Sequence, residues 1–306
     1  LLEQGKTRQA WEKIAEKKGF NFIGNVRVGE DISVEELRKY YDAIIFACGA
    51  PMFTNLGIPG EGEPGTHTAR EFVNWYNGHP DFRDRTFDLS GEIAVVIGLG
   101  NVAMDVARIL SKAVDELRNT DIAQHALDVL TTSKIKEVHL IGRRGPVQAA
   151  FTPAELKEFS DLADCHPVVR LQDLEINAES RAELDLPDNA IIRKNFEILK
   201  DYAARAIPSH KHKRCYFHFL KSPVEFVCDP KIKKVILEET KLIGEPGKQK
   251  AQNTGIKSEL NCRVLFRSVG YRGVPIPVVP FDEKKGVFPN KGGRIINGDQ
   301  MVDGLY

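Results

Sequence analysis

The sequence predicts an α/β protein built on a buried parallel sheet, and three observations support this. Apolar runs typical of strands alternate along the chain with helical patterns. One run, Ala43 to Ala50, is continuously apolar, as in a strand that a parallel sheet buries on both faces. Another leads through glycines into a helical pattern in VVIGLGNVAMDVARIL, Val95 to Leu110. With 306 residues, the chain is long enough for two domains.

The part of the chain before Val95 alternates between predicted helices and strands. Ser33 with Glu36 three residues later has the spacing of a helix-capping box. The Gly- and Pro-rich stretch 51–64 is predicted to be loop. The other predicted elements are a helix at 6–18, a strand at 20–29 ending in a turn at Gly29, a helix at 33–41, the strand at 43–50 and a helix at 68–78 that stops at Gly78.

The part after Leu110 continues the alternation. Residues 180–214 are polar, charged and in part helical by pattern, and the last 30 residues are rich in loop signals. The remaining predicted elements are a strand at 138–141, a helix at 155–164, two strands at 216–227 and 233–243 that we expect to be antiparallel, and a buried strand in 261–270.

Composition and charge exclude several classes of function. The net charge is zero, so we expect no nucleic-acid partner and only local charged patches. No run of 18 apolar residues occurs, which argues against a membrane span. The sequence contains no CxxC pair, so neither a metal site nor a disulfide framework is expected, and a reducing compartment is favoured. The scattered cysteines are Cys48, Cys165, Cys215, Cys228 and Cys262.

The glycine turn has the pattern of a dinucleotide-binding loop. Gly98-Leu99-Gly100-Asn101-Val102-Ala103 is a G-x-G-x-x-A sequence between a predicted strand and a predicted helix. Gly98 allows the tight turn, Gly100 lets a pyrophosphate approach the backbone, and Ala103 lets helix and strand pack closely. The helix N-terminus supplies N–H groups for the phosphates. The alternative is a purely structural turn between a strand and a helix.

The end of the next strand indicates which dinucleotide would bind. NAD-binding folds place an acid there to hold the ribose 2′-hydroxyl, whereas this chain has Arg143 and Arg144 in LIGRRGP. Paired guanidiniums bind a 2′-phosphate through forked hydrogen bonds, so the pattern favours NADPH. The connection from helix to strand is longer than the usual spacing. The alternative is a solvated arginine pair at a strand end.

Several long segments resemble the adrenodoxin reductase family, the mitochondrial-type ferredoxin–NADP⁺ reductases. The resemblance covers essentially the whole chain. It is carried by VVIGLGNVAMDVARIL, GRRGPVQAAFTPAELKE, FIGNVRVGEDISVEELRKYYDAIIFACGA, LGIPGEGEPGTHTAREFVNWYNGHPD and LFRSVGYRGVPIPVVPFDEKKGVFPN. It implies two doubly wound Rossmann-like domains: an NADPH-binding domain at 91–272, inserted in a discontinuous FAD-binding domain formed by 1–90 and 273–306.

The resemblance also implies roles for individual residues. Glu155 matches a carboxylate near the nicotinamide, and Asp105 an acid that relays between cofactor and partner; both are predicted catalytic residues. Their alternative roles are as acids near helix N-termini, where they complement the helix dipole. The cofactor residues it implies are Gly98, Gly100, Asn101, Val102, Ala103, Arg143, Arg144 and Glu155 for NADPH, and Cys48 and Gly49 at a strand end for FAD.

The implied reaction passes a hydride from NADPH to FAD and then single electrons to a [2Fe-2S] ferredoxin of the adrenodoxin type. An acidic ferredoxin requires a basic docking face, and Arg193 with Lys194 fall in the matching stretch. The run from His210 to Arg214 is the other basic candidate, with a solvated face as its alternative. The family implies a location in the mitochondrial matrix. Whether the protein associates with membranes is left open.

The sequence departs from the family at both ends. No G-x-G-x-x-G for a flavin pyrophosphate precedes residue 43, and the expected Gly-Trp segment does not occur before Tyr306. We therefore expect a fragment that lacks both ends of its flavin domain and is inactive alone. Two other functions stay open: a non-catalytic NADPH-binding fragment, and a flavin module of a larger enzyme such as the small subunit of glutamate synthase.

Overall fold

The structure is a computed structural model that describes residues 4–306. The chain divides into a larger unit, residues 56–268, and a smaller unit formed by 4–55 and 269–306. The larger unit begins at residue 56, whereas the sequence predicted a boundary at residue 91, and it ends at 268 rather than 272.

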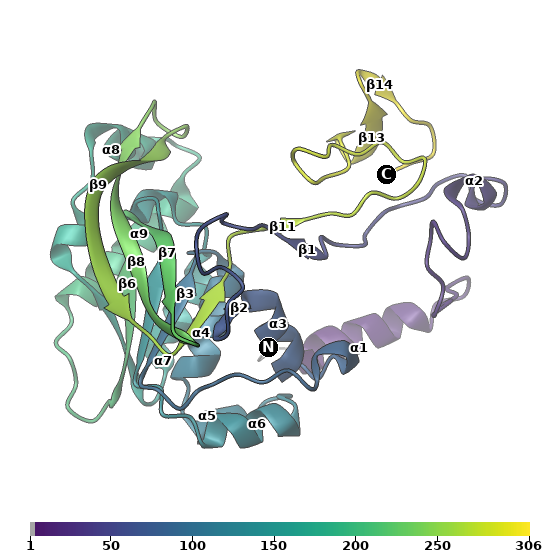
Figure 1. Cartoon of the computed structure of the whole chain (residues 1–306). Helices are drawn as coiled ribbons and strands as arrows, with labels where there is room; N and C mark the ends of the chain where they lie inside the picture. The colour runs from purple at the N-terminus through teal and green to yellow at the C-terminus, as the bar shows by residue number, and fades with distance from the viewer. Residues whose placement is uncertain (1–3) are drawn as a thin grey trace. The chain divides into compact units, whose positions relative to one another are not determined.

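A six-stranded sheet forms the centre of the larger unit, with the spatial order β2-β10-β3-β4-β6-β5 (Figure 1). Each neighbouring pair is parallel, which confirms the α/β class predicted from the sequence. The strands are β2 (Thr66–Thr68), β3 (Ile93–Ile97), β4 (Glu137–Ile141), β5 (Cys165–Val169), β6 (Lys213–His218) and β10 (Val264–Arg267).

Helices follow most of these strands. The expected helices at 68–78, after Val95 and at 155–164 are confirmed as α3, α4 and α7. The helices of the larger unit are α3 (Ala69–Tyr76), α4 (Asn101–Ser111), α5 (Val114–Arg118), α6 (Gln124–Thr131), α7 (Pro153–Asp161), α8 (Ala178–Asp185) and α9 (Ala190–Ala204), with 3₁₀ turns η1 (Pro80–Phe82), η2 (Pro146–Gln148) and η3 (Leu171–Leu174). Within the described range, no helix is long and apolar enough to cross a membrane.

Successive side chains of each strand point to opposite faces of the sheet, and both faces are buried. Val96, Leu140 and Phe266 face the helices α3, α4, α7 and α9 in one core cluster. Val95 and Leu265 alternate with them and are fully buried on the opposite face. An antiparallel three-stranded meander lies across that face (Figure 1). Its strands are β7 (Lys221–Cys228), β8 (Ile232–Ile243) and β9 (Lys250–Asn261).

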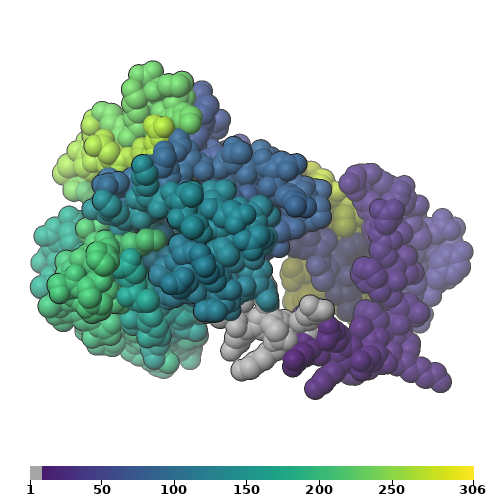
Figure 2. All heavy atoms as spheres, turned by 90° about the horizontal axis from the view of Figure 1, so that it is seen from below, coloured from purple at the N-terminus to yellow at the C-terminus, as the bar shows by residue number. Residues whose placement is uncertain are grey.

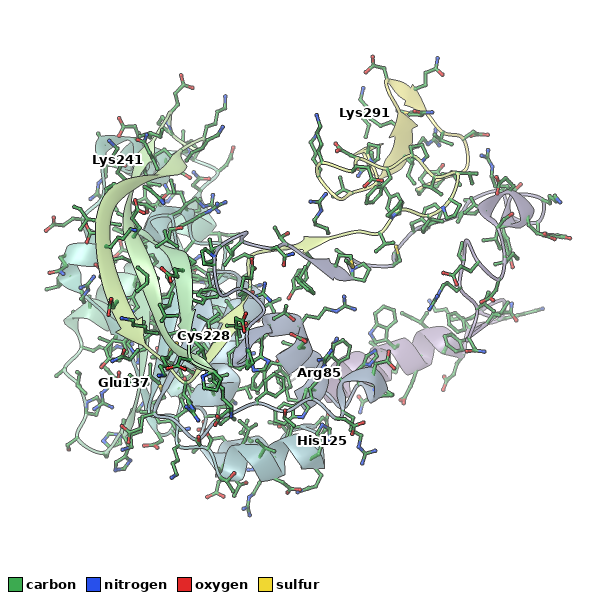
Figure 3. All side chains as sticks on the ribbon, in the orientation of Figure 1. Arg85, His125, Glu137, Cys228, Lys241 and Lys291 are labelled. Atoms are coloured by element: carbon green, nitrogen blue, oxygen red, sulfur yellow. The ribbon has the colours of Figure 1, made fainter. Side chains whose placement is uncertain are left out.

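Residues 56–90 belong to the larger unit because they pack into its core. β2 pairs with β10, and the ring of Phe72 of α3 packs at a tilt of 46° against that of Phe266, with ring centroids 4.7 Å apart. Trp75 packs edge to face on Phe87, and its carbonyl oxygen lies 2.9 Å from Nε2 of His125 (Figure 3). In the view from below, the blue to teal part of the chain, with α3, α5 and α6, forms most of the visible face of this unit (Figure 2).

One long strand predicted at 216–227 is two strands. Its first part belongs to β6 in the parallel sheet, and its second part is β7 of the meander, antiparallel to β8 as expected. Leu220 lies between the two strands and has a φ of 54°. This left-handed conformation is outside the β region, so it ends the first strand and redirects the backbone. β9 was missed because its largely polar, exposed sequence lacks the apolar pattern of a strand.

The smaller unit contains two helices and short strands. Ser33 caps α2, since its Oγ accepts a hydrogen bond from the Glu36 backbone N–H at 3.1 Å, as predicted. A small core gathers Val34, Val279, Ile295 and Leu305. The elements are α1 (Gln4–Ala15), α2 (Val34–Leu37), β1 (Met52–Phe53), β11 (Tyr271–Arg272), β12 (Asn290–Lys291), β13 (Arg294–Asn297) and β14 (Gln300–Met301).

Two predicted strands of the smaller unit are absent from the described residues. In 43–50, Ile44 and Phe46 bond to backbone of 304–306, but Ile45 is 75% exposed and no named strand forms. In 20–29, Phe22 is 84% exposed and only Val28 makes an isolated bridge. A strand needs hydrogen-bonded neighbours on its edges, and these segments have at most one among the described residues.

Candidate functional site

The glycine loop joins β3 to α4 and leaves an open space at its tip. Gly98 has a φ of 133°, and a Cβ there would lie 2.2 Å from the Ser268 carbonyl oxygen, so only glycine fits. A Cβ at Gly100 would meet nothing within 4 Å. Gly100 is also the N-cap of α4, and as a glycine it has no side chain to accept a hydrogen bond from the first turn. The loop therefore presents helix N–H groups to an open space, which suits a phosphate.

The two arginines predicted to bind a 2′-phosphate follow β4, the strand beside β3. Gly142 brings this strand end against the glycine loop, because a Cβ there would lie 2.1 Å from Cδ1 of Leu99. Arg143 and Arg144 come next and are both exposed. Among residues 4–306, neither guanidinium has an acidic or hydrogen-bonded partner in the protein. Two cationic side chains without a partner among the described residues thus lie one and two residues after Gly142, which packs against Leu99 of the glycine loop.

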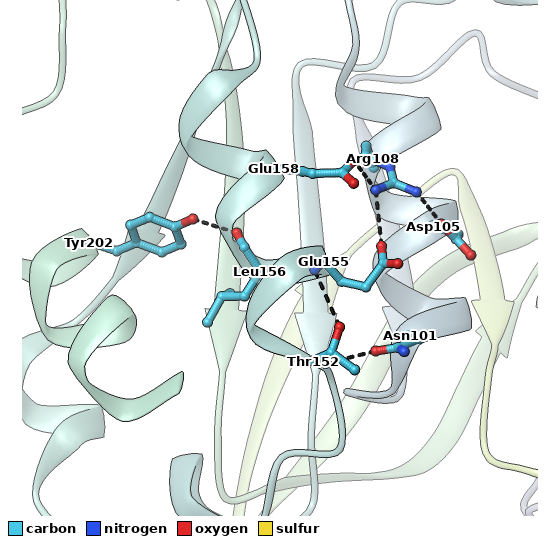
Figure 4. Close-up of polar contacts among 8 residues, drawn as sticks. All are labelled: Asn101, Asp105, Arg108, Thr152, Glu155, Leu156, Glu158 and Tyr202. Atoms are coloured by element: carbon cyan, nitrogen blue, oxygen red, sulfur yellow. Dashed lines mark hydrogen bonds and ion pairs between the residues drawn. The ribbon is translucent and has the colours of Figure 1, made fainter. Parts of the chain in front are cut away.

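The N-termini of α4 and α7 are joined by hydrogen bonds. Oδ1 of Asn101 accepts a hydrogen bond from the Thr152 backbone N–H at 2.9 Å, and the Ala150 N–H donates to the Leu99 carbonyl at 2.9 Å. Thr152 caps α7, in whose first turn Glu155 lies. These bonds place the predicted catalytic Glu155 next to the glycine loop, although 50 residues separate them in sequence (Figure 4).

A buried arginine gathers the predicted catalytic acids. Arg108 of α4 has only 5% of its side chain exposed, and its guanidinium pairs with Asp105, Glu158 and, at 3.0 Å, Glu155 (Figure 4). Burial raises the pKa of Asp105, with Glu155 and Glu158 acting in the same direction and Arg108 opposing them. Asp105 and Glu155, to which the sequence analysis gave separate roles, are therefore both paired with one buried arginine.

Sequence reasoning missed Arg108 and Glu158. The spacing of Asp105 and Arg108, three residues apart on a helix, places both on one face and was an available signal. Contact with Glu155 and Glu158 depends on how α4 packs on α7, which the sequence does not state. Of the other loop residues, Ala103 is fully buried, as close packing of helix and sheet requires, and Val102 is half-buried.

The residues predicted to touch flavin lie in the smaller unit. Cys48 and Gly49 are both exposed, and the strand expected to end at them does not form. Gly49 has a φ of 68°, and a Cβ there would meet nothing within 4 Å. Their assignment to flavin therefore stays a prediction from the family resemblance.

The two residues predicted to bind a partner differ from each other. The guanidinium of Arg193 donates to three carbonyl oxygens at the C-terminal end of α8, those of Leu184 at 2.7 Å, Leu186 at 2.5 Å and Pro187 at 3.1 Å. Lys194 is exposed, and no side-chain bond of it occurs in the part of the chain that the structure describes. Lys194 is thus free for a partner, whereas Arg193 is engaged in the fold.

The basic run from His210 to Arg214 is also engaged. Nζ of Lys211 donates to two carbonyl oxygens, and Nζ of Lys213 to those of Leu110 and Lys112 at the end of α4. His212 pairs with Asp164 at 2.8 Å. The two lysines are therefore engaged within the fold, whereas His210 and His212 stay exposed, so the solvated face considered from the sequence applies only to part of this run.

Comparison with known proteins gives consistent relatives. No family model matches the chain. It is 46% identical over 287 residues to NADPH-ferredoxin reductase FprA of Mycobacterium tuberculosis, covering 93% of this chain and 62% of that protein. The mitochondrial NADPH:adrenodoxin oxidoreductase of Arabidopsis thaliana is 40% identical over 314 residues, covering 97% of this chain and 64% of that protein. The chain thus spans less than two thirds of the length of these relatives.

A solved structure agrees with the fold. The structure of M. tuberculosis FprA in complex with NADPH matches with a TM-score of 0.86 and 45% identity, over 95% of this chain and 63% of that one. The human mitochondrial NADPH:adrenodoxin oxidoreductase is 40% identical over 294 residues. From these identities, sustained over more than nine tenths of its length, we conclude that the chain belongs to the adrenodoxin reductase family.

Proposed function

We propose that this chain carries the NADPH site of a flavin-dependent reductase that passes electrons to an iron–sulfur ferredoxin. One observation carries the proposal: Arg143 and Arg144 are exposed and unpaired among the described residues, beside a glycine loop with open space at Gly100. The names of the relatives, NADPH-ferredoxin reductase and NADPH:adrenodoxin oxidoreductase, support the same activity.

The described residues fit an NADPH molecule at its phosphates. Backbone N–H groups of Asn101, Val102 and Ala103, at the positive end of the α4 dipole, would hold the pyrophosphate. Arg143 and Arg144 would hold the 2′-phosphate with forked, charge-assisted hydrogen bonds. A carboxylate in their place would repel that phosphate, so the pair selects NADPH over NADH.

In this proposal, the acids around Arg108 serve the nicotinamide end of the bound NADPH. When bound, NADPH supplies a hydride for the flavin, while the protein supplies placement and charge. Arg108 orients the Glu155 carboxylate and keeps it at a fixed distance from Asp105. Burial raises the pKa of Asp105, which suits its carboxylate to taking up a proton.

The flavin and the partner have different support. FAD binding rests on the family resemblance, because Cys48 and Gly49 lie outside any strand and form no cradle comparable to the glycine loop. An acidic [2Fe-2S] ferredoxin rests on the relatives and on exposed Lys194, with Arg193 as the lesser candidate because its donors bind carbonyls. The plant and human relatives are named as mitochondrial enzymes and the Mycobacterium protein is not, so a mitochondrial location for this chain is part of the proposal.

The proposal is tested by equilibrium binding of NADPH and NADH, followed by nicotinamide fluorescence. Arg143→Ala with Arg144→Ala should weaken NADPH by on the order of a hundredfold, since a hydrogen bond to a charged group is worth about 1.5–3 kcal/mol and 1.4 kcal/mol is tenfold. NADH should change by less than about threefold, because it has no 2′-phosphate.

A matched control removes two other surface arginines. Arg85→Ala with Arg118→Ala changes the net charge equally, and more than half of each arginine side chain is exposed, beside Glu71 and Asp115 respectively. This control should leave the NADPH affinity unchanged. Equal losses for NADPH and NADH in the Arg143 and Arg144 variant would mean that the pair maintains the loop rather than binding the phosphate.

A further inference from the structure

Three consecutive backbone carbonyls of the arginine segment, Gly142 to Arg144, accept hydrogen bonds from the β6–β7 junction and from β8. The Lys221 N–H donates to the Gly142 carbonyl at 3.0 Å, and the Leu220 N–H donates to that of Arg144 at 3.1 Å. Between them, Oγ1 of Thr240 donates to the carbonyl of Arg143 at 2.7 Å. The backbone of the segment is thus fixed residue by residue, while its two guanidiniums stay unpaired within the described range.

Leu220 connects the separate parts of this arrangement. Its φ of 54° is unusual for a residue with a branched side chain and persists only where the surroundings enforce it. Its N–H reaches Arg144, and its carbonyl accepts the Thr240 backbone N–H at 2.9 Å. The strained residue therefore links the arginine segment to β8.

Thr240 is buried, and the strand around it is irregular. Only 5% of Thr240 is exposed. The pairing of β8 with β9 shifts register between Glu238 and Thr240. Such irregularities bend a strand and redirect a side chain. Lys241, the next residue, lies at the end of the meander far from Glu137, where β4 begins (Figure 3).

We propose that Thr240 is a positioning residue for dinucleotide selectivity. Its hydroxyl holds the Arg143 backbone so that both guanidiniums are already placed where the 2′-phosphate binds, which reduces the entropy lost on binding. The meander, which otherwise only covers the sheet, thereby takes part in choosing NADPH over NADH. This inference rests on the proposed function of Arg143 and Arg144.

The test is Thr240→Val, which removes the hydroxyl and keeps the branched shape. Loss of one neutral hydrogen bond should weaken NADPH about three- to tenfold, with NADH within about twofold. Thr240→Ser keeps the hydroxyl and should restore the NADPH affinity. The matched control is Thr254→Val, because Oγ1 of Thr254 also donates to a meander carbonyl, that of Glu239 at 3.0 Å, and not to the arginine segment. This control should leave both affinities unchanged.

A double-mutant cycle separates this inference from the proposed function. In the Arg143→Ala, Arg144→Ala background, Thr240→Val should have no further effect on NADPH, because the groups it positions are gone. Equal weakening of NADPH and NADH by Thr240→Val, or an equal effect of Thr254→Val, would overturn the inference. No selective effect of the arginine substitutions would instead overturn the proposed function. If Thr240→Val does not fold, Thr240→Ala removes the same hydroxyl, and the same comparison of its NADPH and NADH affinities applies.

Discussion

Four arginines of the larger unit fall into two pairs that the sequence does not distinguish. Arg143 and Arg144 are exposed and, in the described part of the chain, unpaired. Arg108 is enclosed by three carboxylates, and Arg193 donates to three carbonyl oxygens. A guanidinium whose donors are satisfied within the fold contributes mainly to stability, and one whose donors are free is available for an anion. The contacts, rather than the charge, therefore separate structural from binding arginines.

The largest expected effect on stability comes from the enclosed arginine. Arg108→Gln leaves Asp105, Glu155 and Glu158 without their cation. Loss of one partner of a buried ion pair costs about 3–5 kcal/mol, and the lower end applies because the carboxylates keep a quarter or more of their surface exposed. Urea unfolding at neutral pH measures this loss.

The control for Arg108 is Arg118→Gln. Arg118 forms a surface ion pair with Asp115, in which 59% and 95% of the side chains are exposed, so its loss should cost less than about 0.5 kcal/mol. The deficit of Arg108→Gln should shrink as the pH falls, since protonation removes the repulsion among the carboxylates. A deficit that does not depend on pH would show that Arg108 acts through packing instead.

A smaller effect distinguishes Arg193 from its neighbour. Arg193→Ala removes three hydrogen bonds at the end of α8 and should cost about 1–2 kcal/mol, because water replaces part of the lost donors. Lys194→Ala should cost less than about 0.5 kcal/mol. Thermal unfolding measures both.

For partner binding, we expect the opposite order: substitution of Lys194 should have a larger effect than substitution of Arg193. Lys194→Glu should slow association with an acidic ferredoxin and flatten its salt dependence, without affecting reduction of a small acceptor. If Arg193→Ala is as stable as the parent and slows association more than Lys194→Glu, the division between engaged and free cations does not hold for this pair.

The smallest expected effect is on the pH dependence of stability, and it comes from two buried histidines that are neutral. Nδ1 of His139 lies 2.9 Å from Nε2 of His218. Burial, with His139, Arg170 and Lys221 nearby, lowers the pKa of His218 to about 3. Burial also lowers the pKa of His139, although Glu137 opposes this.

Because these pKa values lie below the unfolded value of 6.5, the unfolded chain binds more protons in acid. The contribution of His218 to stability is therefore complete above pH 6.5 and falls as the pH drops from 6.5 towards 3. By pH 5.5 the loss should be about 1 kcal/mol. Urea unfolding at pH 7.5 and 5.5 should show a smaller drop for His218→Asn than for the parent, and equal drops would contradict the buried, neutral state.

Local sequence signals predicted the glycine loop and its helix well. Gly98 has a positive φ that favours glycine, Ala103 is fully buried between helix and sheet, and the space at Gly100 is open, as the loop pattern predicts. The position of Arg143 and Arg144 beside the loop also follows from the sequence, because neighbouring parallel strands end at the same edge of a sheet. The ion pairs of Arg108 and the hydrogen bond of Thr240 depend on contacts between distant segments and could not be predicted this way.

The incorrect predictions have a common cause. Ala43 to Ala50 has the apolar pattern of a buried strand, but a pattern does not supply the neighbouring strands that bury it. The boundary expected at residue 91 ignored Phe72 and Trp75, whose packing partners in the larger unit lie up to about 200 residues away. Similarly, the break at Leu220 depends on hydrogen bonds to Arg144 and Thr240 rather than on its own side chain.

The most direct test of the central claim compares two small probes that differ only at the 2′ position. Isothermal titration of the unmodified chain with 2′,5′-ADP and with 5′-AMP isolates the 2′-phosphate, without any nicotinamide or flavin. If Arg143 and Arg144 bind that phosphate, 2′,5′-ADP should bind on the order of a hundredfold more tightly, and Arg143→Ala with Arg144→Ala should abolish most of the difference. Equal affinity for the two probes would contradict the account, because the exposed arginines would then contribute nothing to cofactor choice.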